Sequence, residues 1–147
     1  MSEFLAGKSV RKITTGIKVD TTSGVANGVN DLFEVVGGRV KVLQLMGEVT
    51  TQIGAGATVI HFQNDLVDLS LAAGADIDAA VVGTNIGMTG AVGDASVATV
   101  GYLIAQNAPQ ILNPGTINFN STAARAGAIS WSVIYVPIDD GAYIEAA

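Results

Sequence analysis

Hydrophobic and polar residues alternate along much of this chain, which is the pattern of β-strands with one buried face. The clearest case places Ile129, Trp131, Val133 and Tyr135 on one face, so Trp131 is predicted to lie in the core. Pro137 cannot donate to a strand ladder and is expected to end this strand. Similar strands are predicted at residues 13–19, 33–36, 39–51, 58–63, 66–71, 98–104 and 116–120, with a short last segment at 143–144.

A β-hairpin is predicted around Gly37-Gly38, because a two-residue glycine loop favours a turn with positive φ. Its register would place Glu34 opposite Lys41 as a cross-strand charge pair. Further along the second arm, Gly47 predicts a bulge or bend at which the strand changes sheet.

Loops are predicted at residues 20–30 and at Asn113-Pro114-Gly115, where Pro and Gly suit a type II turn. Short strands and loops are preferred over a helix in residues 64–96, because each glycine there would weaken a helix by about 1 kcal/mol relative to Ala. The chain is therefore predicted to be all-β, a single-domain β-sandwich or jelly-roll-like barrel of about eight short strands. Residues 1–12 are expected to form an N-terminal arm, and residues 13–147 the domain.

The composition points to contacts with other chains. Only 14% of the 147 residues are charged, against a usual share of about 25%. Part of the surface is therefore expected to be buried against further copies of the chain or against a partner. The chain has no cysteine, which excludes disulfides, thiolate metal ligands and cysteine catalysis.

The net charge of −6 argues against nucleic-acid binding, which needs a basic surface. Residues 1–18 carry four cations, Lys8, Arg11, Lys12 and Lys18, against Glu3, a net charge of +3, whereas the remainder carries three cations against twelve carboxylates, −9. A basic arm on an acidic body could dock on an acidic neighbour. No stretch is apolar enough to cross a membrane and the start lacks a signal peptide, so a soluble protein made in the cytoplasm is expected.

Few residues suggest chemistry. His61 lies in a predicted strand, and no serine has a nucleophile-elbow context, so a structural or surface role is expected for this histidine. Asp76-Ile77-Asp78 departs from the EF-hand pattern because Ala80 occupies the fifth position and no glutamate closes the loop. Asp139-Asp140 is interpreted as part of a turn before glycine. No catalytic, cofactor-binding or metal-binding residue is predicted, no cofactor is implied, and the chain is not expected to be an enzyme.

Two C-terminal segments carry a resemblance to a known group of proteins. The first is the turn and strand Pro114-Gly115-Thr116-Ile117, and the second is the ending from Gly127 to Ala142, which has the form G-x-I-x-W-x-V-x-Y-x-P-I-D-x-G-A. Both resemble segments of small virion structural proteins of tailed bacteriophages. Weaker similarities lie at residues 38–42, 47–50, 71–78, 83–84 and 89–90.

This resemblance implies a non-enzymatic capsid decoration (cement) protein that binds the outer shell and bridges capsomers. It would be located in the virion and made in the host cytoplasm, with the major capsid protein and further copies of itself as partners, a trimer being favoured. Lys8, Arg11 and Lys12 are the candidate capsid contacts.

Two alternatives remain open at this point. The first is a tail, neck or fibre component, and the second is a carbohydrate- or receptor-binding module. Tyr102 and Tyr135 are predicted to lie in strands, which counts against the second alternative because sugar sites use aromatic residues in loops.

Overall fold

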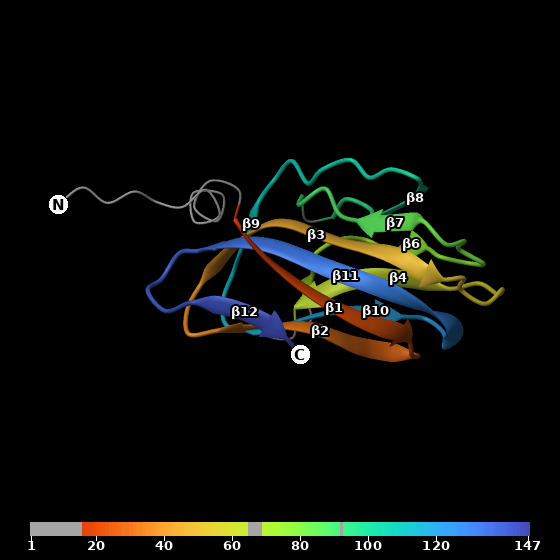
Figure 1. Ribbon diagram of the computed structural model, residues 1–147, viewed down its shortest axis with the longest axis horizontal. Coiled ribbons are helices and arrows are strands. Elements are labelled where there is room, and N and C mark those ends of the chain that lie inside the picture. Colours follow the sequence, from red (N-terminus) through yellow and green to blue (C-terminus); the bar gives the residue numbers. More distant parts are fainter. Residues whose placement is uncertain (1–15, 65–68, 92) are drawn as a thin grey trace.

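The computed structural model describes residues 16–64, 69–91 and 93–147. These residues form two antiparallel sheets of six strands each, with no helix and no closed barrel, so the predicted all-β sandwich is confirmed (Figure 1). The strands of the first sheet follow the order β1-β11-β3-β7-β8, with β9 also on β3; those of the second follow β12-β2-β10-β4-β5, with β6 also on β4. The strands are β1 (Ile17–Val25), β2 (Gly28–Val36), β3 (Val40–Thr51), β4 (Val59–Asn64), β5 (Leu69–Ser70), β6 (Ala75–Asp76), β7 (Thr84–Gly87), β8 (Val97–Val100), β9 (Gln110–Leu112), β10 (Gly115–Ser121), β11 (Arg125–Pro137) and β12 (Tyr143–Ala146).

The core lies between the two sheets and is centred on Trp131, which is fully buried. Its ring meets Phe62 edge-on at a centroid distance of 5.6 Å and Phe119 at 5.3 Å. The two phenylalanines belong to the second sheet and Trp131 to the first, so these contacts join the layers. The indole N–H donates to the hydroxyl of Ser23 at 2.9 Å, which satisfies the polar atom of this side chain.

The strand predicted around Trp131 is confirmed as β11, which lies between β1 and β3 and ends at Pro137. The prediction for Gly47 is wrong, since β3 stays in one sheet. Its register against β11 skips at Leu43 and Thr50. A Cβ on Gly47 would lie 2.5 Å from the Trp131 ring, so only glycine at this position leaves room for the indole.

The hairpin predicted at Gly37-Gly38 does not form. β2 pairs with β10 and β12, whereas β3 pairs with β7, β9 and β11, so the two glycines connect the two sheets. Glu34 consequently lies opposite Glu145, and Lys41 lies opposite Val136. Both β2 and β3 pair with strands that are distant in sequence. The alternation of hydrophobic and polar residues in β2 and β3 fits these partners as well as it fits a hairpin, so it could not distinguish the two.

Residues 20–30 are also not a loop as predicted. β1 continues to Val25, β2 begins at Gly28, and the side chain of Asn30 closes the short link by exchanging hydrogen bonds of 2.9 Å with the backbone of Ala26. At Asn113-Pro114-Gly115 the chain again passes from the first sheet to the second, and the φ of Gly115 is +149° rather than the roughly +80° of a type II turn.

The strand count differs from the prediction of about eight short strands. Twelve strands are present in the described residues, and β3 and β11 have 12 and 13 residues. The strand predicted at 98–104 ends at Val100, so Tyr102 is not in a strand. The preference for short strands and loops after residue 64 is confirmed by β5, β6 and β7.

Some predictions fall on residues that the structure does not describe, namely the arm at 1–12, the start of the first strand at 13–15, and part of the 66–71 strand. The described part of the chain contains no helix of the length and apolarity needed to cross a membrane.

Candidate functional site

The candidate capsid contacts Lys8, Arg11 and Lys12 lie outside the described residues. Lys18, at the start of β1, pairs with Asp20 on the same strand, with 3.2 Å between its Nζ and the carboxylate oxygen Oδ1. Both side chains are more than half exposed, so this ion pair contributes little to stability.

His61 lies on β4 and is half-buried. Its Nε2 lies 2.9 Å from the side-chain nitrogen of Gln63, and its strand partner on β10 is Asn120. Asp76 and Asp78 fasten local backbone, because Asp76 accepts from the Asp78 N–H at 2.9 Å and Asp78 accepts from the Gly56 N–H at 2.7 Å. Within the described ranges no three His, Asp or Glu side chains gather closely enough to hold a metal ion.

Asp139 has a role that the sequence analysis did not predict. Its carboxylate accepts two hydrogen bonds from the Arg39 guanidinium, at 3.0 and 2.9 Å, and a third from the Arg39 backbone N–H at 2.8 Å. These donors lower the pKa of Asp139 to about 2. The pair fastens the link between β2 and β3 to the residues that follow β11. Because the two residues are 100 positions apart, no local motif could have indicated the contact.

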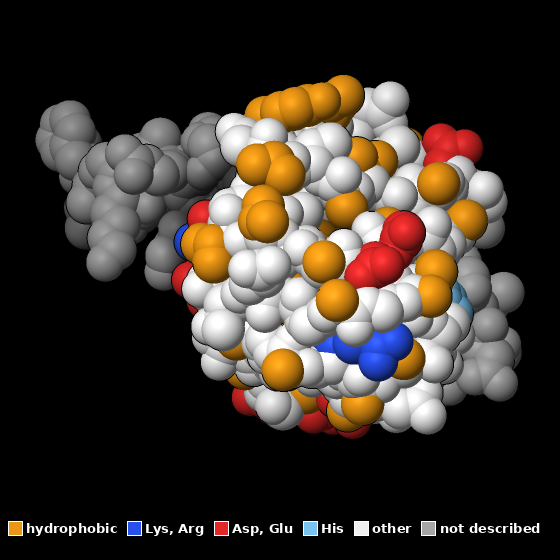
Figure 2. Space-filling model, turned by 90° about the vertical axis from the view of Figure 1, so that its right-hand side faces the viewer, with side chains coloured by type: hydrophobic (Ala, Val, Ile, Leu, Met, Phe, Trp, Pro, Cys, Tyr) orange, Lys and Arg blue, Asp and Glu red, His pale blue; other side chains and the backbone are white. Residues whose placement is uncertain are grey.

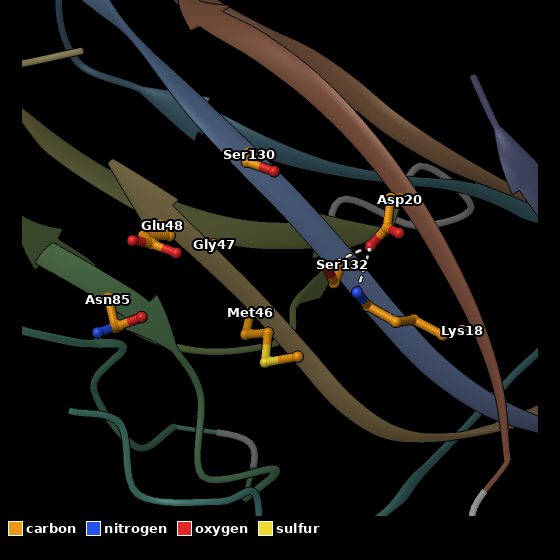
Figure 3. A pocket seen from close by; sticks show the side chains of 8 residues that line it. All are labelled: Lys18, Asp20, Met46, Gly47, Glu48, Asn85, Ser130 and Ser132. Atoms are coloured by element: carbon orange, nitrogen blue, oxygen red, sulfur yellow. Dashed lines mark hydrogen bonds and ion pairs between the residues drawn. The ribbon is translucent and has the colours of Figure 1, made fainter. Parts of the chain in front are cut away.

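A polar groove of about 380 Å³ crosses the outer face of the first sheet. Its floor is formed by the small residues Ser130 and Ser132 of β11. The strand register places Ser132 between Asp20 on β1 and Met46 on β3, and it places Ser130 opposite Glu48 on β3. Figure 3 shows Lys18 and Asp20 on one side of the two serines and Glu48 on the other. The full lining is Lys18, Asp20, Met46, Gly47, Glu48, Asn85, Ser130 and Ser132.

The charged groups of the groove are already engaged with one another at one end. The hydroxyl of Ser132 donates to Asp20 at 2.5 Å, and this bond, with the nearby Lys18 ammonium, lowers the pKa of the Asp20 carboxyl. The groove therefore offers hydroxyl, amide and carboxylate groups for hydrogen bonding to a polar chain, and its lining has neither a histidine nor a cysteine.

A second surface lies at one edge of the first sheet, and we call it the apolar rim. It consists of Val100, Tyr102, Ile104 and Ile111, whose exposed fractions are 61%, 62%, 74% and 62%. Figure 2 shows hydrophobic atoms at the top of the molecule, the side on which Figure 1 draws the segment from β8 to β9. Because four large hydrophobic side chains are rarely exposed on one short segment, this surface is a candidate for protein contact.

The backbone beneath the rim is held firmly. The N–H groups of Asn107 and Ala108 both donate to the Thr89 carbonyl, at 3.1 and 3.2 Å, and the side chain of Gln110 donates to the Gly90 carbonyl at 2.9 Å. A Cβ on Gly90 would lie 1.7 Å from the Ala108 carbonyl oxygen, so only glycine permits this approach. These bonds fix the chain between Ile104 and Ile111, which lowers the entropic cost of binding at this end of the rim.

The pattern at residues 98–104 predicts a strand that runs through Tyr102, so the rim does not follow from alternation alone. A signal was nevertheless present, since residues 95–124 contain no Asp, Glu, Lys or Arg. A long uncharged segment with exposed turns is compatible with an interface.

No protein-family model matches the chain, and neither a curated protein nor a solved structure matches it.

Proposed function

We propose that this chain is a non-enzymatic structural protein of a tailed-bacteriophage virion, acting as a capsid decoration protein that binds the outer shell and bridges capsomers. The observation that carries the proposal is the apolar rim, an exposed hydrophobic surface on the segment from β8 to β9. Such a surface suits a protein whose task is to be covered by other protein. The resemblance of residues 114–117 and 127–142 to virion proteins supplies the biological setting.

The rest of the molecule supports a role in protein contact. The polar groups at Asp139, Asp78 and Asp20 all fasten the fold itself through hydrogen bonds. Two sheets packed around a single aromatic cluster form a stiff body, which suits a protein that bridges neighbouring subunits. In this role a homo-oligomer would present several binding faces to the shell at once, and its avidity would exceed the affinity of one copy.

The test is the copy number of the protein in purified particles, measured by gel densitometry against the major capsid protein. A copy number comparable to that of the capsid protein supports decoration of the shell. A small minority copy number would move the assignment to a tail, neck or fibre component. Absence from the particles would refute the virion proposal.

A carbohydrate- or receptor-binding module is the second candidate, and one observation favours it. Tyr102 lies in a loop with most of its side chain exposed, so it could act as a platform for a sugar ring. Binding of the pure protein to a glycan array tests this candidate. Signals that disappear in Tyr102→Ser and persist in the exposed control Tyr143→Ser would support it.

A further inference from the structure

The apolar rim lies on the segment from β8 to β9, at an edge of the first sheet that carries no charged residue. Among the described strands β8 is the last of the first sheet and pairs with β7 alone. Natural sheets protect exposed edges with charged residues, prolines or bulges. Here Pro109 precedes β9, but the segment has no charged residue, and Val100 and Ile111 lie exposed at its two ends. This edge is therefore expected to be covered when the protein is at work.

Charge indicates what covers it. The whole net charge of −6 is carried outside residues 95–124. A basic partner would be drawn to the acidic surfaces elsewhere on the molecule, whereas the uncharged rim offers it no electrostatic attraction. Two acidic copies of this chain, by contrast, can approach closely only through a surface without charge. The rim meets this condition, and it holds four of the ten large hydrophobic side chains that are exposed among the described residues.

The shape of the rim is also suited to pairing with itself. An apolar hollow of about 80 Å³ is lined by Met88, Val97, Leu103 and Ile104, and the exposed Tyr102 directly precedes Leu103 in the chain. Leu103 points inward against Gly87, while its neighbours on both sides are exposed. An exposed side chain next to a hollow suits a twofold contact, because the Tyr102 ring of each copy can enter the hollow of the other.

We propose that the apolar rim is covered by a second copy of this chain, rim against rim, in a twofold pair. This inference rests on the proposed function and deepens it by naming the partner of the rim. The pair would be the unit that is delivered to the capsid, and it would leave the polar groove and the outer face of the second sheet free. A twofold contact closes at two copies, so it differs from the trimer that the resemblance favours.

The experiment is sedimentation velocity on the full chain over a wide range of concentrations. We expect a dimer, and we expect Tyr102→Ser and Ile104→Ser each to weaken it by about 30-fold or more, as residues at the centre of an interface do. The matched control is Tyr143→Ser, which removes a tyrosine that is 43% exposed on β12 of the other sheet, and it should leave the dimer intact. Circular dichroism verifies that each variant remains folded.

Introduced cysteines test the orientation, because the chain has none of its own. A mixture of the Tyr102→Cys and Ile104→Cys variants should give a disulfide-linked dimer of one of each on mild oxidation, because Tyr102 of one copy meets the hollow of the other, and Tyr143→Cys should not give a linked dimer. A monomer at all concentrations, a trimer, or an oligomer that the rim variants leave unchanged would overturn the inference. A monomer that is nevertheless abundant in particles would refute the inference alone, and a rim-dependent dimer that is absent from particles would refute the proposed function alone.

Discussion

Gln106 makes a buried contact with Gln44, which lies 62 positions earlier, in the middle of β3. The Gln106 backbone N–H donates to the side-chain oxygen of Gln44 at 2.6 Å, and the side-chain oxygen of Gln106 accepts from the Leu45 N–H at 3.3 Å. β7 pairs with residues 46–48 of β3, and β9 pairs with residues 40–42. Gln106 therefore supplies a hydrogen-bond partner for the part of β3 that neither short strand reaches.

The first prediction concerns this contact. Gln106→Ala keeps the backbone donor to Gln44 but leaves the buried Leu45 N–H without its acceptor and removes the donor to the Val42 and Ala108 carbonyls. It should therefore lower the free energy of unfolding by about 1–3 kcal/mol. Denaturant unfolding followed by the fluorescence of the single tryptophan measures this loss. The neighbouring variant Asn107→Ala, at an exposed position, should change the stability by less than about 0.5 kcal/mol. Equal effects of the two variants would argue against a special role for Gln106.

The second prediction concerns the approach of Gly47 to Trp131. Gly47→Ala places a methyl group within 2.5 Å of the indole, so the ring must shift and the protein should lose about 1–3 kcal/mol of stability. The same measurement applies, and the tryptophan emission should change as the ring moves. Gly24→Ala is the matched control, because its Cβ would have its nearest neighbour at 3.8 Å. A Gly47 variant as stable as the Gly24 variant would contradict the packing argument.

The third prediction concerns pH. Arg39 lowers the pKa of Asp139 from 3.8 to about 2, so the stabilisation by this pair is present above about 3.8 and is lost as the pH falls through about 2. Asp139→Asn should therefore melt at a lower temperature than the wild type at neutral pH, and the gap should close between these two pH values. Both groups are exposed, so the gap will be small. A gap of constant size from pH 6 to about 2 would exclude Asp139 as its source.

The fourth prediction concerns the N-terminal arm. Deletion of residues 1–12 should abolish binding to particles and leave the melting temperature unchanged, because β1 begins only at Ile17. Replacing Lys8, Arg11 and Lys12 together by glutamine separates charge from chain length. If charge is responsible, this triple variant should bind as poorly as the deletion, and wild-type binding should weaken with salt. Full binding by the deleted protein would remove the arm from the proposal.

The strands that could be predicted are those whose pattern depends on local alternation. β4, β10 and β11 were placed correctly because each has a regular period of two and is bounded by turn residues. The core position of Trp131 followed from the same alternation and is confirmed. His61 lies in a strand, as predicted, whereas Asp76, predicted in a loop, ends the short strand β6 and only Asp78 lies in a turn.

The sequence by itself thus determined the all-β class, the buried face of the most regular strands and the scarcity of charge. Only the tertiary structure decided which strands pair, since Gly37-Gly38 joins two sheets instead of closing a hairpin. It also decided the contact of Arg39 with Asp139 and the exposure of Tyr102. The physical reason is that alternation records only which face of a strand is buried, and several strands of similar pattern can satisfy that condition. The choice among them depends on the packing of residues that are about 100 positions apart in the chain.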